Sequence, residues 1–362
     1  MPRLQLGWLV GVACALGCSK RSEPMAAFDE SADTVLVDAS LKSVPVRAVW
    51  QLSGSAIGKP FLLALGTAGL AVVDYVGDPE LHLVDIARGT IVRSVGRRGQ
   101  GPGEFQSVLA IASDRTDRTA TWIYDPQLSR VTRLFLGEPD PTVHAMTLTL
   151  PATPTFMRLT SLSNPARLVG LTDVPTPRYE MVDAQGKVTS EFNGPMLGPI
   201  QLDAEQRVKL SADARMCSSP AGDRFAVAYF HAGRIEYFDG TGKLTGIAAV
   251  PFASDGSAKL SQQKTLVRSA PRYYYSDCAA TDRYVFALFA GRRVTAANAS
   301  TVNNTNVVHV FDWSGKFLGI IKLEEEAEAV EVDQDAANLY AASSATGTVV
   351  RYSLRAALDM LR

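Results

Sequence analysis

Side chains able to do acid–base or metal chemistry show no catalytic spacing in this sequence of 362 residues. The four histidines stand far apart, and no two have the spacing of zinc ligands. The Gly-x-Ser-x-Gly sequence of one class of serine hydrolases does not occur, nor does an EF-hand calcium loop. We therefore predict no catalytic residue, no metal site and no cofactor.

Carboxylates do recur in one regular pattern, which is a β-rich run, a turn that begins with Asp, and a second β-rich run. The copies contain Asp85, Asp125, Asp183, Asp239 and Asp312. In the clearest copies the turn reads Asp-x-x-Gly-Lys. Asp can accept hydrogen bonds from the backbone two residues on, and Gly adopts positive φ without steric cost. We interpret these carboxylates as equivalent turn residues spread around a rim, rather than as a converging catalytic pair.

Whether cysteines form disulfides depends on how oxidising their compartment is. Two of the four cysteines lie in the N-terminal apolar segment, which leaves Cys217 and Cys278. In an oxidising compartment two such cysteines favour a disulfide. The alternative is two unpaired buried thiols. Both readings stay open, because the sequence does not show whether the two Cα atoms lie within about 7 Å.

The N-terminus indicates export. Arg3 precedes a mostly apolar run, Leu4 to Gly17, that ends in Ala-Leu-Gly-Cys. The run is too short for a spanning helix, which needs roughly 20 apolar residues. Its end resembles the bacterial lipobox, although Ala15 stands where Leu is usual. That resemblance implies cleavage after Gly17 and lipid, including palmitate, on Cys18. The alternative is a plain secretory signal.

The chain divides into a signal peptide (1–17), a tether rich in Ser, Glu and Ala (18–33) and one folded domain (34–362). Ser19, rather than Asp, follows the cysteine, and in lipoproteins of the enteric type this favours the outer membrane. We expect the protein to face the periplasm or the cell surface. A net charge of −1 gives no basic face for nucleic acid.

The repeated pattern predicts an all-β, six-bladed β-propeller. Six copies, the last of them degenerate, recur at intervals of roughly 40 to 75 residues, which is the range of propeller blades. A blade of about four strands cannot bury both its faces, whereas blades stacked in a ring cover one another. We expect Val44–Leu52 to join the last blade as its outer strand and close the ring. The alternative is an open sandwich. Leu354–Leu361 is the one stretch that favours a short helix.

A glycine-rich segment, Gly96 to Phe105, follows the first copy. It lacks the Lys-Ser/Thr and helix start of a phosphate loop, so we interpret it as a sharp crossing between blades. Together with Ile123 to Val131 it resembles an NHL-type repeat, with Ser129 where Asn is usual. The mature chain also resembles the six-bladed propeller lipoproteins of Gram-negative bacteria, including the BF3164-like group. That resemblance implies a fold and a location in the cell envelope, but it does not imply a reaction.

Exposed Tyr and Arg residues are the candidates for recognition, because both types are favoured at binding hot spots and loops on rigid scaffolds often carry binding. The candidate binding surface consists of Arg97, Arg98, Tyr273, Tyr274, Tyr275, Arg292 and Arg293. The alternative is that each tyrosine is simply a strand former and each arginine a surface residue.

We expect a monomeric, lipid-anchored envelope protein that binds or scaffolds a protein or glycan partner, and no enzyme. The alternative is a metal-dependent propeller hydrolase or lyase of the lactonase kind. That activity would require acidic and amide side chains to meet on the ring axis around a divalent ion.

Overall fold

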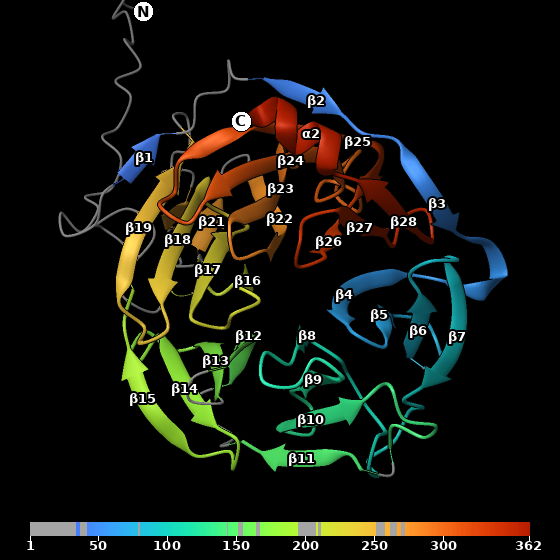
Figure 1. Cartoon of the computed structure of the whole chain (residues 1–362). Coiled ribbons are helices and arrows are strands. Elements are labelled where there is room, and N and C mark those ends of the chain that lie inside the picture. The colour runs from blue at the N-terminus through green and yellow to red at the C-terminus, as the bar shows by residue number, and fades with distance from the viewer. Residues whose placement is uncertain are drawn as a thin grey trace, which may run out of the picture.

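The chain forms a closed ring of six β-sheets, so the predicted six-bladed β-propeller is confirmed (Figure 1). The computed structural model describes residues 34–36, 42–78, 80–142, 144–150, 155–163, 167–194, 208, 211–250, 258–260, 266–268 and 272–362. Within these ranges, no helix has the length and apolar character needed to cross a bilayer.

Each blade is an antiparallel sheet, and its strands follow one another in order from the ring axis to the outer rim. Blade 1 contains β4 (Pro60–Gly66), β5 (Gly69–Asp74), β6 (Leu81–Asp85) and β7 (Thr90–Val95). Blade 2 contains β8 (Ala110–Ser113), β9 (Ala120–Asp125), β10 (Arg130–Phe135) and β11 (Met146–Thr149). Blade 3 contains β12 (Phe156–Leu162), β13 (Arg167–Thr172), β14 (Tyr179–Asp183) and β15 (Val188–Phe192).

The second half of the ring repeats this order. Blade 4 contains β16 (Ala214–Ser218), β17 (Arg224–Tyr229), β18 (Arg234–Asp239) and β19 (Leu244–Ala249). Blade 5 contains β22 (Arg272–Ala280), β23 (Tyr284–Arg293), β24 (Thr305–Asp312) and β25 (Phe317–Ala327). Blade 6 contains β26 (Ala329–Val332), β27 (Asn338–Ser343), β28 (Thr348–Ser353) and β3 (Ala48–Leu52).

The N-terminal strand closes the ring as predicted, but over a shorter length. β3 pairs antiparallel with β28 as the outer strand of blade 6. The preceding residues form a separate strand, β2 (Ser43–Pro45), which pairs parallel with β25 of blade 5. The predicted single strand Val44–Leu52 is therefore wrong at its start. Its apolar residues serve two different cores: Val44 packs between blades 5 and 6, and Leu52 packs between blades 6 and 1.

Shorter elements complete the chain. β1 (Thr34–Leu36) pairs parallel with β19, so blade 4 also carries a fifth strand. A 3-10 turn, η1 (Gly54–Ala56), precedes blade 1, and β20 (Ala258–Leu260) pairs with β21 (Leu266–Arg268). The predicted terminal helix is present as α2 (Arg355–Leu361), which packs its buried residues against the rim of blade 5.

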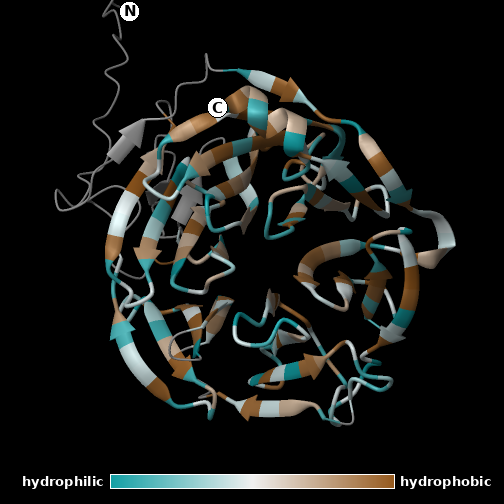
Figure 2. Ribbon diagram, in the orientation of Figure 1, coloured by the Kyte–Doolittle hydropathy of each residue, from teal (hydrophilic) through white to brown (hydrophobic). Residues whose placement is uncertain are grey.

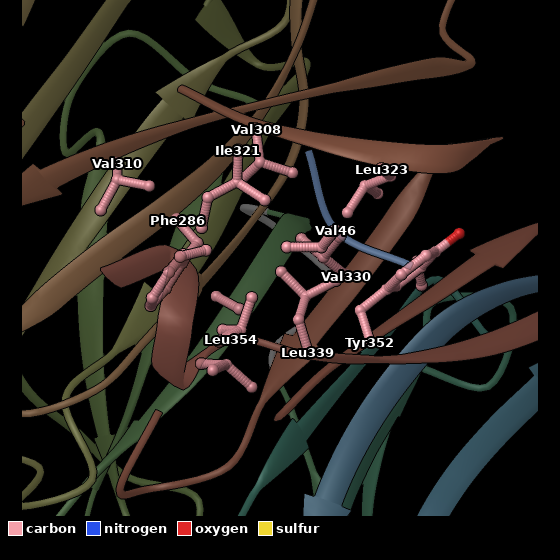
Figure 3. Packing of buried hydrophobic residues seen from close by; sticks show 14 of the residues in the cluster. Val46, Phe286, Val308, Val310, Ile321, Leu323, Val330, Leu339, Tyr352 and Leu354 are labelled. Carbon is pink, nitrogen blue, oxygen red and sulfur yellow. The ribbon is translucent and has the colours of Figure 1, made fainter. Parts of the chain in front are cut away.

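Six hydrophobic clusters hold the described ring together, and each lies between two adjacent blades. The cluster between blades 5 and 6, for example, joins Phe286 and Val308 to Leu339 (Figure 3). Hydrophobic and hydrophilic positions alternate along many strands, whereas the loops around the middle of the ring are largely hydrophilic (Figure 2). Burial between sheets therefore supplies the main driving force for closure, at about 25 cal/mol per Å² of apolar surface.

The two faces of the ring carry different loops. We call the side that holds the second-to-third-strand turns and the crossings between blades the crossover face. The other side, which holds the first-to-second and third-to-fourth turns, is the hairpin face. Asp85, Asp183, Asp239 and Asp312 all stand at third-to-fourth turns of the hairpin face.

Asp125 is the exception among the five predicted turn aspartates. It ends β9, the second strand of blade 2, and so lies at the crossover face. Its carboxylate accepts hydrogen bonds from the backbone of Gln106 and Ser107, in the segment that leads to the inner strand. Asp74 in blade 1 accepts bonds from Gly58 and Lys59 in the same way. The predicted equivalence of all five turns is therefore wrong for Asp125.

Candidate functional site

The ring axis holds a narrow cavity lined by the six inner strands, of about 60 Å³. This volume admits water molecules or a very compact ligand, since sites for drug-sized molecules run to roughly 300–1,000 Å³. Its charged lining residues are Arg115, Arg158, Arg215, Asp277 and Glu331. The site is therefore small, polar and of mixed charge.

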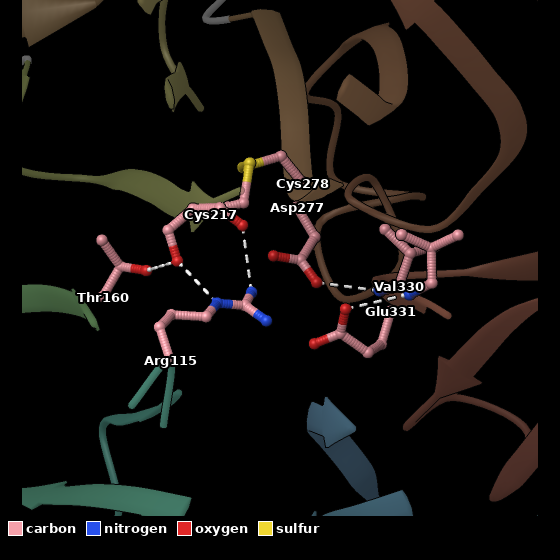
Figure 4. Close-up of a disulfide and its surroundings, with 9 residues drawn as sticks. Arg115, Thr160, Cys217, Asp277, Cys278, Val330 and Glu331 are labelled. Carbon is pink, nitrogen blue, oxygen red and sulfur yellow. Dashed lines mark hydrogen bonds between the residues drawn. A yellow bond between two sulfur atoms is a disulfide. The ribbon is translucent and has the colours of Figure 1, made fainter. Parts of the chain in front are cut away.

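Arg115 comes from the turn after β8 and is held by blade 4. Its Nε donates to Ser218 Oγ at 3.0 Å and its Nη2 donates to the Ser218 carbonyl at 3.0 Å. Ser218 Oγ also bonds to the Thr160 hydroxyl of blade 3 at 3.1 Å. The guanidinium is thus held by Ser218 of blade 4, which Thr160 of blade 3 supports (Figure 4).

Two carboxylates face Arg115 across the axis (Figure 4). Asp277 Oδ2 accepts a bond from the Val330 backbone at 2.8 Å, and Glu331 Oε1 accepts one from Val332 at 2.9 Å. Burial raises the pKa of Asp277 to about 7, against the opposing charge of Arg215 and these backbone bonds. Burial likewise raises the pKa of Glu331, with Arg115 acting in the opposite direction.

A second charged group lies where β12 and β16 begin, at the crossover face. Asp213 Oδ1 lies 3.5 Å from the guanidinium groups of both Arg158 and Arg215, and its Oδ2 lies 3.4 Å from His231 Nε2. Burial alone would raise the pKa of Asp213, but the His231 hydrogen bond and the two arginines hold it well below its ordinary value. Burial, together with the positive charge of Arg215, lowers the pKa of Arg158 to about 9.

The described residues contain no group of three His, Cys, Asp or Glu side chains arranged to hold a metal ion. On the axis, the acidic and amide cluster that the hydrolase alternative requires is replaced by two carboxylates among three arginines. Of the histidines, His309 is buried and stacked on Phe289, with ring centroids 4.2 Å apart, and burial lowers its pKa to about 3.

Cys217 and Cys278 are joined by a disulfide that links β16 to β22, the inner strands of blades 4 and 5. The two Cα atoms lie 5.8 Å apart, within the range that a bridge needs. Both cysteines line the axial cavity, and Cys278 directly follows Asp277 (Figure 4). The lipidation candidate Cys18 and the tether lie outside the described residues.

The predicted surface residues separate into two places on the crossover face. Arg97 and Arg98 lie in the crossing from blade 1 to blade 2, whereas Tyr273 and Arg292 are paired across β22 and β23 in blade 5. The ring order places blades 2 and 5 on opposite sides of the axis. The seven predicted residues therefore do not form one patch.

Two of the tyrosines were predicted wrongly as surface residues. Tyr274 is 3% exposed and Tyr275 is fully buried, both in the cluster between blades 4 and 5. Tyr273 is partly exposed, and its ring packs at a tilt against Phe230, with centroids 4.1 Å apart. Arg292 pairs with Glu326, and Arg293 is exposed. A bulge after Tyr273 breaks the regular alternation of side chains along this strand, so neighbouring tyrosines are both buried.

The glycine-rich crossing is a rigid platform for Arg97 and Arg98. Gly96 and Gly103 adopt positive φ, as the sequence predicts for a sharp crossing. Arg130 of β10 donates to the carbonyl oxygens of Gln100 and Glu104. Glu104, in turn, accepts bonds from the Gly101 backbone and the Arg97 side chain. The loop is held by a strand rather than left free.

Beside this platform are two exposed apolar residues that the sequence reasoning missed. Tyr75 is 67% exposed and Val76 is 56% exposed, in the second-to-third turn of blade 1. We call Tyr75, Val76, Arg97 and Arg98 the crossover-face patch. Tyr75 and Arg98 line a hollow of about 260 Å³ together with Phe61, Glu80 and Gln106. The sequence contains one indication of this patch, because Tyr75 and Val76 stand in a turn, where polar residues are usual.

The axial cavity, the closure strand and the six inter-blade cores define a six-bladed β-propeller. The chain belongs to the TolB-like 6-blade propeller-like family, whose model matches residues 42–335. No curated protein matches the chain.

Solved structures with similar folds include U3-55K, with a TM-score of 0.53, 10% identity, and coverage of 85% of this chain and 98% of that one. The β-propeller domain of Cps50 (Swd1) from Myceliophteria thermophila has a TM-score of 0.47 and 12% identity, and covers 85% of this chain and 99% of that one. At 10% identity, the similarity to U3-55K shows the fold alone.

Proposed function

We propose that this chain is a lipid-anchored propeller of the cell envelope that binds a protein partner through the crossover-face patch. The observation that carries the proposal is the juxtaposition of exposed Tyr75 and Val76 with two arginines on a loop fixed by Arg130. Aromatic and Arg side chains dominate binding energy at protein interfaces. A rigid base reduces the entropy that such side chains lose on binding.

The charges of the patch remain available to a partner. Arg97 pairs with Glu104 at 2.7 Å and Arg98 pairs with Glu80 at 3.2 Å. The two arginine side chains are 78% and 67% exposed, whereas the side chains of their partners Glu104 and Glu80 are only 21% and 6% exposed. Solvent therefore reaches the arginine end of each pair and weakens it. An acidic side chain of the partner can compete for either guanidinium. We therefore expect a protein segment that combines apolar and acidic residues, and a glycan is the other outcome of the test.

The envelope address rests on the N-terminal sequence and on the family, whose members are often periplasmic or envelope-associated. Lipid on Cys18 would hold the monomeric propeller at the outer membrane, because each buried methylene contributes about 0.8 kcal/mol. The described residues hold no group of three His, Cys, Asp or Glu side chains for the divalent ion that the hydrolase or lyase alternative requires.

Two measurements test this proposal separately. Labelling of cells with an acyl analogue should mark the native chain and leave the Cys18→Ser variant unmarked; an unmarked native chain would refute the anchor. Crosslinked pull-downs from intact envelopes should recover a protein with the native chain and lose it with Tyr75→Ala. Glycosidase treatment of the envelopes shows whether the captured species is a glycan instead, which would contradict the proposed protein partner.

A further inference from the structure

The axial cavity holds opposite charges that act on one another across the ring axis without forming a contact ion pair. Among the residues that the structure describes, Arg115, Asp277 and Glu331 line the cavity and form no ion pair within 4.0 Å. Arg115 uses Nε and Nη2 on Ser218, which leaves its Nη1 directed into the cavity (Figure 4). The carboxylates are held from behind by backbone N–H groups.

Charges in such a position are costly unless a counter-charge meets them, because the surrounding protein screens them less than bulk water does. A simple anion next to Arg115 would also meet the two carboxylates. A simple cation between Asp277 and Glu331 would also meet Arg115 and Arg215. One molecule that carries both charges can place its negative group on Arg115 and its positive group between Asp277 and Glu331.

We infer that the axial cavity binds a compact zwitterion of the α-amino acid class, with its carboxylate on Arg115 and its ammonium between Asp277 and Glu331. The volume of about 60 Å³ restricts the ligand to a small member of that class, such as glycine. Arg115, Asp277 and Glu331 are each partly exposed, so the cavity is reached by solvent. This site is distinct from the crossover-face patch and does not depend on it.

The site is built from different blades, which gives it a fixed spacing. Arg115 belongs to blade 2, Asp277 to blade 5 and Glu331 to blade 6. The disulfide next to Asp277 ties blade 5 to blade 4, which also holds Arg115 through Ser218. The distance between the two charged walls is therefore set by the closed ring and not by flexible loops.

Calorimetric titration of the full chain in detergent with three probes at equal ionic strength tests the inference. Glycine should bind, while acetate and methylammonium, each with only one of the two charges, should bind at least tenfold more weakly. Arg115→Met and Asp277→Asn should each weaken glycine binding at least tenfold. Arg88→Met on the hairpin face is the matched control and should leave it unchanged.

Three results would overturn the inference: no glycine binding by the native chain, equal binding of acetate or methylammonium, or unchanged glycine binding in both cavity variants. Near-UV circular dichroism checks that each variant is folded. If Arg115→Met does not fold, Asp277→Asn and Glu331→Gln decide the question. Partner capture by the crossover-face patch should be the same in all cavity variants that fold.

Discussion

The carboxylate of Asp125 accepts a hydrogen bond from the backbone N–H of Gln106 at 2.6 Å. The same carboxylate accepts bonds from Gln127 and Leu128 in its own turn. It therefore joins the end of β9 to the segment that carries the chain from blade 1 into blade 2. The same Asp125-to-backbone contact supports the loop that holds Arg97 and Arg98.

Asp125→Ala should destabilise the protein more than a hairpin-face aspartate variant does. Asp125 is 1% exposed, and hydrogen bonds to charged groups contribute about 1.5–3 kcal/mol each, so we expect a loss of roughly 3 kcal/mol. Asp85→Ala, whose turn is exposed, should give a clearly smaller loss. Urea unfolding of both variants measures this, and a larger effect of Asp85→Ala would contradict it.

The disulfide should stabilise the ring by restricting the unfolded chain. For two cysteines 61 residues apart, the entropic account gives about 4 kcal/mol. The double variant Cys217→Ala, Cys278→Ala should lose roughly 2–4 kcal/mol in the free energy of unfolding. Reductant should destabilise the native chain and leave the double variant unaffected. Equal stability of both proteins without reductant would refute the prediction.

Asp277 should make stability fall as pH rises. Its pKa is about 7 in the folded protein and about 3.9 in an unfolded chain, so the folded state binds the proton more tightly. The stabilisation is complete below about pH 4 and is lost as pH rises through 7. Asp277→Asn should be more stable than the native chain at pH 8 by roughly 2–4 kcal/mol, at about 1.4 kcal/mol per pKa unit.

Unfolding at pH 4, 6 and 8 checks that sign. The difference between Asp277→Asn and the native chain should grow with pH. Asp312→Asn, a hairpin-face turn residue, should show no such growth. A difference that shrinks with pH would show that a cationic group pairs with the Asp277 carboxylate in solution.

Arg97→Glu and Arg88→Glu form a matched pair on the two faces of blade 1. The two side chains are 78% and 79% exposed, and each pairs with one nearby carboxylate. Both variants should keep stability within about 0.5 kcal/mol of the native chain, as surface changes usually do. Only Arg97→Glu should reduce partner capture from envelopes. Equal partner capture by both variants would show that Arg97 is not part of the binding surface.

The sequence predicts the ring well because the inter-blade cores are formed by alternating apolar residues in each strand. It does not predict where a given turn lies within a blade. Asp125 has the same flanking pattern as Asp85, yet the long segment before β8 places it one strand earlier in its blade. Ser129, in that same turn, has φ 46°, a conformation that Asn adopts more readily than Ser does.

The binding candidates are less predictable, since exposure depends on tertiary packing. Tyr274 and Tyr275 were predicted from residue type alone, and a bulge in β22 buries both. The axial charges Arg115, Asp277 and Glu331 lie in unrelated segments of the sequence. They meet only when blades 2, 5 and 6 close around one axis, and no local pattern indicates that meeting.

Site-specific photocrosslinking in intact cells tests the proposed binding function most directly. A photoreactive residue placed at Tyr75 should give one dominant crosslinked protein species, while the same residue at Arg88, on the hairpin face of the same blade, should give none. Crosslinking from position 88 and not from position 75 would contradict the crossover-face patch, and crosslinking from neither in cells that make the full chain would contradict a protein partner held there.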